Sequence, residues 1–189
     1  MRRLFLVVIM AAVVVVPYQS TAGQTSFWVE EQTFFSDGKK VPKIHTLLLQ
    51  DFNKKHLGLF GYFQVQEDYA QAYVGPTLSP VPWLQAGVGG GLEQADTPVR
   101  LGSFVWMGDA HRYLLAIYEN GGGGYWYHAE ANASITDWFG AGAVVEHLIG
   151  VGPRAELNIP RLPAKIWVAS LYDWSADGVS GLLAFRLSF

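Results

Sequence analysis

Apolar and polar residues alternate with a period of two along much of this chain, which is the pattern of strands with one apolar and one polar face. In the segment Tyr125–Ile135, every odd position is apolar or tyrosine, whereas the even positions include His128, Glu130 and Asn132. We expect the odd face to meet an apolar medium and the even face to point into a polar interior. The same alternation recurs in Leu84–Glu93 and Val151–Ile159.

The last nine residues show the pattern most clearly. Leu183, Phe185, Leu187 and Phe189 fall on one face of a strand that stops on an aromatic residue at the carboxyl terminus. This segment resembles the closing strand of bacterial outer-membrane β-barrels. The resemblance implies that Phe185, Leu187 and Phe189 form the signal that the barrel-insertion machinery reads. An ordinary edge strand is the alternative interpretation.

Turn-forming residues divide the chain at intervals of about a dozen residues, which predicts about twelve strands. An even number returns both termini to one side, the periplasm. The count falls to ten if Tyr69–Pro76 and Lys165–Trp174 do not form strands, because both segments are short or ambiguous. The eleven breaks are at 36–40, 53–55, 66–68, 76–82, 93–98, 108–109, 120–124, 136–137, near Gly150, at 160–163 and at 175–178.

The amino terminus has the features of a secretory signal peptide. Arg2 and Arg3 precede an apolar run from Leu4 to Val16, and small residues end at Ala22. We expect cleavage after Ala22, leaving residues 23–189 as one domain outside the cytoplasm. The apolar run is shorter than a comfortable transmembrane helix of about 20 residues. The chain has no cysteine, so neither disulfides nor a lipid-bearing cysteine support the exported protein.

The composition agrees with a protein that shows apolar surface to a medium other than water. Charged residues make up 15% of the chain and aromatic residues 14%, whereas soluble domains carry about 25% charged residues. In lipid, only a closed sheet satisfies all backbone hydrogen bonds when no spanning helix is present. We therefore predict an all-β fold, a single closed antiparallel transmembrane barrel with short hairpin connections. No basic stripe indicates binding of nucleic acid.

Charged residues on the inward phase are the candidate functional residues. A hairpin centred on Gly150 would pair Glu146 with Arg154, and a turn near Asp137 would place His128 opposite Glu146. Glu130 and Glu156 lie one step away, and the row falls toward the outer mouth. It is either a structural network of salt bridges or a ring that selects solutes. Arg100 and Arg186 complete the predicted lumen residues.

The predicted luminal charges are nearly balanced, so no strong ion preference follows. They comprise Glu30, Glu93, Glu130, Glu146 and Glu156 against Arg100, Arg112, Arg154 and Arg186. Glycines on the inward phase either open a passage or leave room for bulky neighbours such as Trp106 and Trp126. These glycines are Gly87, Gly89, Gly91, Gly140 and Gly142.

Two segments depart from clean alternation. Ile44–Leu49 is apolar on both phases apart from His45 and Thr46, and Phe104 shares its phase with Arg100. Either part of the interior is hydrophobic or the register slips there. Aromatic residues near strand ends on the apolar phase are expected at the headgroup level. They are Phe27, Phe63, Tyr69, Tyr113, Tyr125, Tyr127, Phe139 and Phe189.

A passive conduit for small solutes in the bacterial outer membrane fits these features best. Outer-membrane lipid, the insertion machinery and small solutes are its expected partners, and the sequence names no oligomer and no cofactor. The alternatives are a closed structural or accessory barrel and a soluble exported barrel with a ligand cavity. In the closed barrel, the charges would fill the lumen together with Trp28, Phe104, Trp106 and Trp126.

An outer-membrane lipid hydrolase is disfavoured. The phospholipases and lipid A deacylases of this class place a serine two residues after a histidine on one strand, and here Glu130 follows His128. Ser134 shares the phase but lies roughly 20 Å away at about 3.3 Å per residue. His45, His56 and His111 have no second ligand at a same-face spacing, which argues against a metal site.

Overall fold

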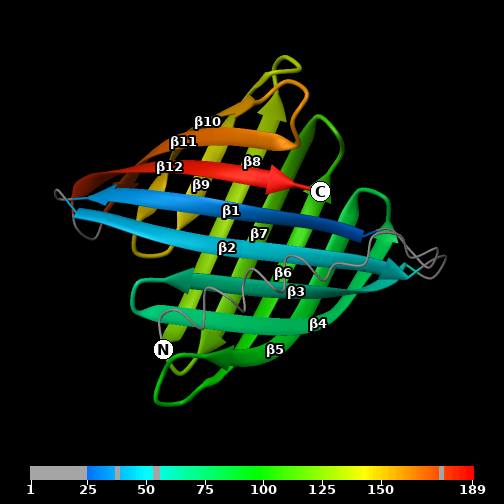
Figure 1. Cartoon of the computed structure of the whole chain (residues 1–189), viewed down its shortest axis with the longest axis vertical. Coiled ribbons are helices and arrows are strands. Elements are labelled where there is room, and N and C mark those ends of the chain that lie inside the picture. The colour runs from blue at the N-terminus through cyan, green and yellow to red at the C-terminus, as the bar shows by residue number, and fades with distance from the viewer. Residues whose placement is uncertain (1–24, 37–38, 53–55, 175–176) are drawn as a thin grey trace.

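The computed structural model describes residues 25–36, 39–52, 56–174 and 177–189, and within them it is all-β with twelve strands (Figure 1). The predicted signal peptide lies outside the described residues. None of the described residues forms a helix long and apolar enough to cross a membrane. The strands are β1 (Thr25–Ser36), β2 (Lys39–Phe52), β3 (Leu57–Gln66), β4 (Tyr69–Val81), β5 (Leu84–Glu93), β6 (Val99–Gly108), β7 (Arg112–Gly121), β8 (Gly124–Ser134), β9 (Phe139–Glu146), β10 (Gly150–Asn158), β11 (Ala164–Asp173) and β12 (Gly178–Ser188).

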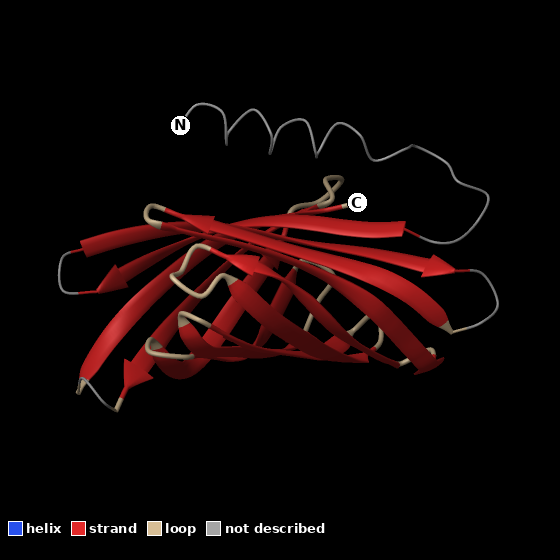
Figure 2. Ribbon diagram, turned by 90° about the horizontal axis from the view of Figure 1, so that it is seen from below, coloured by secondary structure: helices blue, strands red, loops and turns tan. Residues whose placement is uncertain are grey.

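The twelve described strands close into one antiparallel barrel, which confirms the predicted fold class. Each strand pairs with its sequence neighbours, and β1 closes the ring against β12, with Trp28 opposite Ser188. Strands of the near and far walls cross at a steep angle in Figure 1, and Figure 2 shows the flattened outline of the ring. The even count places Thr25 of β1 and Ser188 of β12 at the same end.

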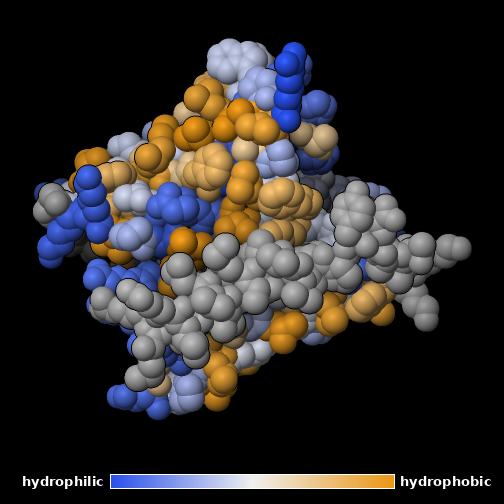
Figure 3. All heavy atoms as spheres, in the orientation of Figure 1, coloured by the Kyte–Doolittle hydropathy of each residue, from blue (hydrophilic) through white to orange (hydrophobic). Residues whose placement is uncertain are grey.

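Polar side chains line the inside of the wall and apolar side chains cover the outside. On β8, His128 and Glu130 are buried, whereas Tyr125 and Tyr127 are exposed. Much of the visible outer wall in Figure 3 is apolar, and large hydrophilic residues stand at its edges. The alternation in the sequence therefore predicts the two faces correctly, because successive strand residues point to opposite sides.

One predicted break is too long. β4 continues to Val81, so that only Pro82 and Trp83 connect it to β5. Pro80 is tolerated within β4 because the pairing with β5 shifts register between Leu78 and Val81. Pro76 lies before this shift, opposite Leu59 of β3. The other predicted breaks coincide with short connections. The two longest connections between described strands are equal in length and span residues 94–98 and 159–163.

Part of the interior is hydrophobic, which explains the two irregular segments without a register slip. Leu47 and Phe104 are buried inside, in one cluster with Phe60 and Tyr73. A Cβ atom at Gly87 would lie 2.5 Å from the Phe104 ring. Gly87 and Gly89 of β5 thus make room for the rings of Phe60 and Phe104, and not for the expected Trp106 and Trp126.

Two of the aromatic residues assigned to the outer face point inward. The hydroxyl of Tyr69 donates to Glu93 Oε2 at 2.7 Å, and the hydroxyl of Tyr113 donates to Glu130 Oε1 at 3.1 Å. Both residues lie next to a turn, where phase is hardest to assign because one inserted residue exchanges the faces. The remaining six lie on the outward phase of their strands.

Candidate functional site: the interior of the barrel

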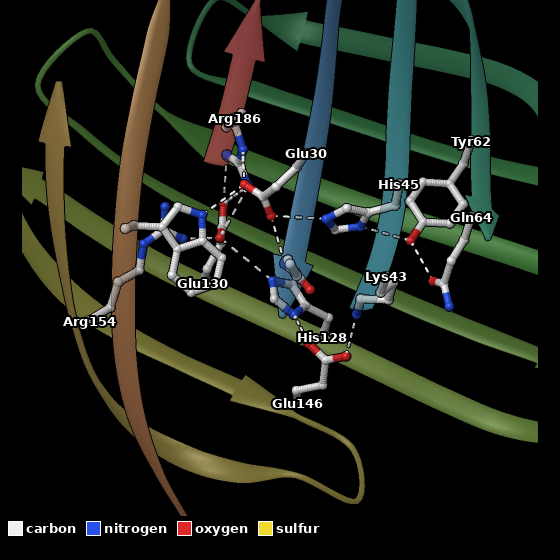
Figure 4. A network of polar contacts seen from close by, with 12 residues as sticks. Glu30, Lys43, His45, Tyr62, Gln64, His128, Glu130, Glu146, Arg154 and Arg186 are labelled. Carbon is white, nitrogen blue, oxygen red and sulfur yellow. Dashed lines mark hydrogen bonds and ion pairs between the residues drawn. The ribbon is translucent and has the colours of Figure 1, made fainter. Parts of the chain in front are cut away.

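Two buried glutamates organise the middle of the lumen. Glu130 on β8 and Glu30 on β1 both accept hydrogen bonds from Arg186 on β12. Arg186 Nη1 lies 3.2 Å from Glu130 Oε1, and all three side chains are at most 8% exposed. Since β1 and β12 face β8 across the barrel, Arg186 connects opposite walls (Figure 4).

Arg154 on β10 joins the same cluster from another side. Its Nη1 donates to Glu130 Oε2 and its Nη2 donates to Glu156 Oε2 at 2.6 Å. The guanidinium carbon lies 4.0 Å from the centre of the Trp167 ring, and Trp167 Nε1 donates to Glu30 Oε2 at 2.8 Å. Glu30, Glu130 and Glu156 therefore each face at least one guanidinium, which compensates their buried charges.

A second cross-lumen link joins β2 to β9. Lys43 Nζ donates to Glu146 Oε1 at 2.6 Å, and His128 Nδ1 lies 2.9 Å from Glu146 Oε2. His128 Nε2 lies 3.6 Å from Glu130 Oε2, which connects this link to the central cluster. Figure 4 shows these side chains converging from both walls.

A third group surrounds Arg100 on the β4–β7 side of the barrel. Arg100 Nη1 donates to Glu93 Oε2 at 2.7 Å, and Arg100 Nε donates to Glu119 Oε2 at 2.9 Å. Glu119 also accepts hydrogen bonds from Gln71 Nε2 at 2.8 Å and from the Tyr73 hydroxyl at 2.9 Å. Glu119 is fully buried, so these donors replace the water that it loses.

Histidine, tyrosine and glutamine side chains join the Arg100 group to the central cluster. His45 Nε2 lies 2.9 Å from Glu30 Oε1, and its Nδ1 lies 3.2 Å from the Tyr62 hydroxyl. The Tyr62 hydroxyl donates to Gln64 Oε1 at 3.0 Å, and Gln71 Nε2 donates to the same oxygen at 3.4 Å. One continuous polar network thus spans the lumen.

This network separates two hollows that share no lining residue. The distal vestibule, at the end away from the termini, has a volume of about 640 Å³ and contains Lys43, Arg100 and Glu119 in its lining. The proximal vestibule, at the end of the termini, has a volume of about 320 Å³. Between them, Glu30 and Ala184 are 0% exposed and Trp167 is 1% exposed, so side chains fill the midsection.

The predicted lumen residues other than Arg112 all lie inside the barrel, but one predicted pair is wrong. His128 lies opposite Glu146, as expected. Glu146 pairs with Gly150, however, and Arg154 pairs with Gly142. The hairpin is centred on Leu148, whose φ of 65° makes the turn, two residues earlier than predicted. Arg154 therefore reaches Glu130 and Glu156, while Lys43 bonds to Glu146.

The luminal charge inventory also changes. Arg112 points outward, with an 81% exposed side chain 3.5 Å from Asp109, and does not belong to the lumen. Lys43 and Glu119 are buried inside the barrel but are absent from the predicted luminal charges. Both share the phase of buried neighbours on their strands. Lys165 also faces inward, where its Nζ donates to Glu156 Oε1 at 2.8 Å.

The two buried histidines, His45 and His128, have hydrogen-bond partners suited to a packed network. His45, which the sequence left without a partner, bonds within the central cluster. Within the part of the chain that the structure describes, no group of three or more His, Asp and Glu side chains is placed to hold a metal ion.

Comparison with known proteins identifies the fold of the chain but no family. Neither a protein-family model nor a curated protein sequence matches the chain. The solved structure of a KdgM porin matches with a TM-score of 0.55 and 12% identity, over 86% of this chain and 99% of that one. The Acinetobacter baumannii outer membrane protein Omp33 matches with a TM-score of 0.51 and 8% identity, over 90% of this chain and 100% of that one. The chain therefore has the fold of bacterial outer-membrane β-barrels, the class that its last strand resembles.

Proposed function

We propose that this protein is a porin-like barrel of the bacterial outer membrane that conducts small solutes through a charged lumen. The observation that carries the proposal is a closed barrel with an apolar outer wall and a polar interior that is hollowed from both ends. The fold shared with a KdgM porin supports the same function. Export by a cleaved signal peptide and folding by the barrel-insertion machinery belong to the proposal.

The conduit would be narrow. The ionic network occupies the midsection, so passage requires a solute to move between charged side chains that otherwise bond to each other. Such a constriction favours small polar solutes over large ones, because each displaced hydrogen bond must be replaced. Paired charges of both signs predict weak discrimination between anions and cations.

A closed accessory barrel is the second candidate, and the filled midsection favours it. Between the vestibules, Trp167 is 1% exposed and Ala184 is 0% exposed. Such a barrel would serve envelope integrity or a larger assembly and would conduct nothing.

Single-channel recording in planar lipid bilayers separates the two candidates. The conduit predicts discrete conductance steps from the purified protein, larger in the double variant Lys43→Ala/Glu146→Ala, which removes a cross-lumen link. A wild-type barrel that is folded, as judged by heat-modifiable migration, but silent would rule out the conduit and support the closed barrel.

A further inference from the structure

The proximal vestibule has an apolar lining that a channel for fully polar solutes does not need. Trp28, Phe104 and Trp106 form its aromatic wall, with Leu47 and Leu49 beside them. The distal vestibule also has apolar lining residues, such as Phe34, Trp126 and Ile149, but it adds three glutamines and a larger number of charged groups. Phe104 and Leu47 are only 4% and 5% exposed, so the apolar surface open to the hollow comes from the half-buried Trp28, Trp106 and Leu49. Apolar surface that is open to solvent is unfavourable unless it is covered some of the time, which indicates a solute with an apolar body.

The charged group that reaches this vestibule is an ammonium. The Lys165 side chain is 21% exposed, whereas the side chains of Arg186 and Glu130 in the same lining are 8% and 0% exposed. Arg186 is already bonded to both Glu30 and Glu130. Arg186 and Glu130 are thus committed to the central cluster, and Lys165 is the lining residue best placed to meet a solute charge.

Lys165 has bonding capacity left over. Its ammonium carries three N–H groups, of which one donates to Glu156 Oε1. Glu156 is also held by Arg154, so it stays paired if Lys165 turns toward a second anion. The Asp51 carboxylate at the same mouth already accepts a hydrogen bond from Gln85 Nε2 at 3.3 Å.

From this arrangement we infer that the proximal vestibule binds small amphipathic monoanions, in which an aromatic or branched apolar body carries one carboxylate. The apolar body lies against Trp28, Phe104 and Trp106, and the carboxylate accepts a charge-assisted hydrogen bond from Lys165. The volume of about 320 Å³ is at the small end of ligand pockets, which range from about 300 to 1,000 Å³, and limits the ligand to a single ring or short chain. This inference deepens the proposed conduit and rests on it for the role of the ligand as a transported solute.

Calorimetric titration of the full barrel in detergent tests the site with three probes. They are 3-phenylpropionate, the neutral 3-phenyl-1-propanol and the short propionate. We expect 3-phenylpropionate to bind and each of the others to bind at least about tenfold more weakly, since each lacks one of the two interactions. Equal affinity for all three, or binding of none, would overturn the inference.

Variants assign the two interactions to residues. Lys165→Met should weaken binding of 3-phenylpropionate about tenfold and leave 3-phenyl-1-propanol unchanged, whereas Lys165→Arg should retain binding. Trp106→Leu should weaken both ring-bearing probes. The matched controls at the other end, Lys40→Met and Trp126→Leu, should change neither. A Lys165→Met variant that binds 3-phenylpropionate like the wild type would overturn the assignment of the carboxylate.

Conductance measured on the same preparations keeps the two proposals apart. Binding by a silent barrel would leave the site standing and remove the conduit. Conductance without selective binding of 3-phenylpropionate would leave the conduit standing and remove the site.

Discussion

Lys43 Nζ and Glu146 Oε1 lie 2.6 Å apart across the interior, although 103 residues separate them in the chain. Both side chains are at most 3% exposed, so each charge has lost most of its contact with water. The pair ties β2 to β9, strands on opposite walls of the barrel. Its rupture therefore affects both the stability of the barrel and the width of its lumen.

We expect Lys43→Met to lower the free energy of unfolding by about 3–5 kcal/mol, because Glu146 then keeps a buried charge that only His128 faces. The double variant Lys43→Met/Glu146→Leu should recover part of this loss, since no uncompensated carboxylate remains. Urea-induced unfolding in phospholipid vesicles measures both values. Strictly additive effects of the two substitutions would show that the pair does not interact.

Trp167 is the residue whose removal should widen the constriction most directly. Its ring is 1% exposed, lies under Arg154 and bonds to Glu30. Trp167→Ala should cost about 3–5 kcal/mol of stability and raise single-channel conductance. Trp138→Ala, in the exposed connection after β8, is the control and should change neither. Unchanged conductance in a folded Trp167→Ala barrel would mean that the central cluster does not limit passage.

The apolar outer wall of the barrel predicts that lipid surrounds it. Ala129 lies on the outward phase midway along β8, so Ala129→Arg should destabilise the barrel in a bilayer by about 2–4 kcal/mol. Leu148→Arg, at a turn position that is 77% exposed, should cost less than about 1 kcal/mol. Refolding titrations into phospholipid vesicles compare the two. An equally small effect at both positions would show that lipid does not contact β8.

The carboxyl-terminal strand should control assembly more than stability. Phe185 and Phe189 are outward and exposed, and the ring of Phe189 stacks on Phe27 at 6.2 Å between centroids. If they form the insertion signal, Phe189→Ala should reduce the fraction of heat-modifiable protein in the outer membrane several-fold. Ser188→Ala, on the inward phase of the same strand, is the control. Normal assembly of Phe185→Ala/Phe189→Ala would contradict that role.

Alternation along the strands predicts the inward position of His128, Glu130, Glu156 and Arg186, and the spacing of turn-forming residues predicts the strand number. Both signals are local in the sequence. The partner of Arg154 could not be predicted in the same way. Its identity depends on the turn at Leu148, and moving the centre of a hairpin by two residues moves the pairing by four.

Contacts across the lumen were beyond sequence reasoning for a different reason. Lys43 meets Glu146, and Arg186 meets Glu130, because the sheet closes and brings opposite walls together. Pairing between adjacent strands gives no information about such distances. Arg112 and Tyr113 were assigned to the wrong faces since they begin a strand, where the phase is set by the length of the preceding turn.

The final prediction concerns the turn between β6 and β7. The backbone N–H groups of His111 and Arg112 donate to Asp109 Oδ1 at 2.8 and 3.0 Å, and these hydrogen bonds hold the pKa of the Asp109 carboxyl below its ordinary value. A carboxyl with a lowered folded-state pKa stabilises the fold above its unfolded pKa of about 3.9, and this contribution disappears as pH falls through the folded value. The difference in unfolding free energy between the wild type and Asp109→Asn should thus be constant above about pH 4 and shrink below it. Carboxyl-carbon NMR titration gives a direct check, since a midpoint equal to that of an unfolded peptide of the same sequence would mean that the turn does not hold the ionised form.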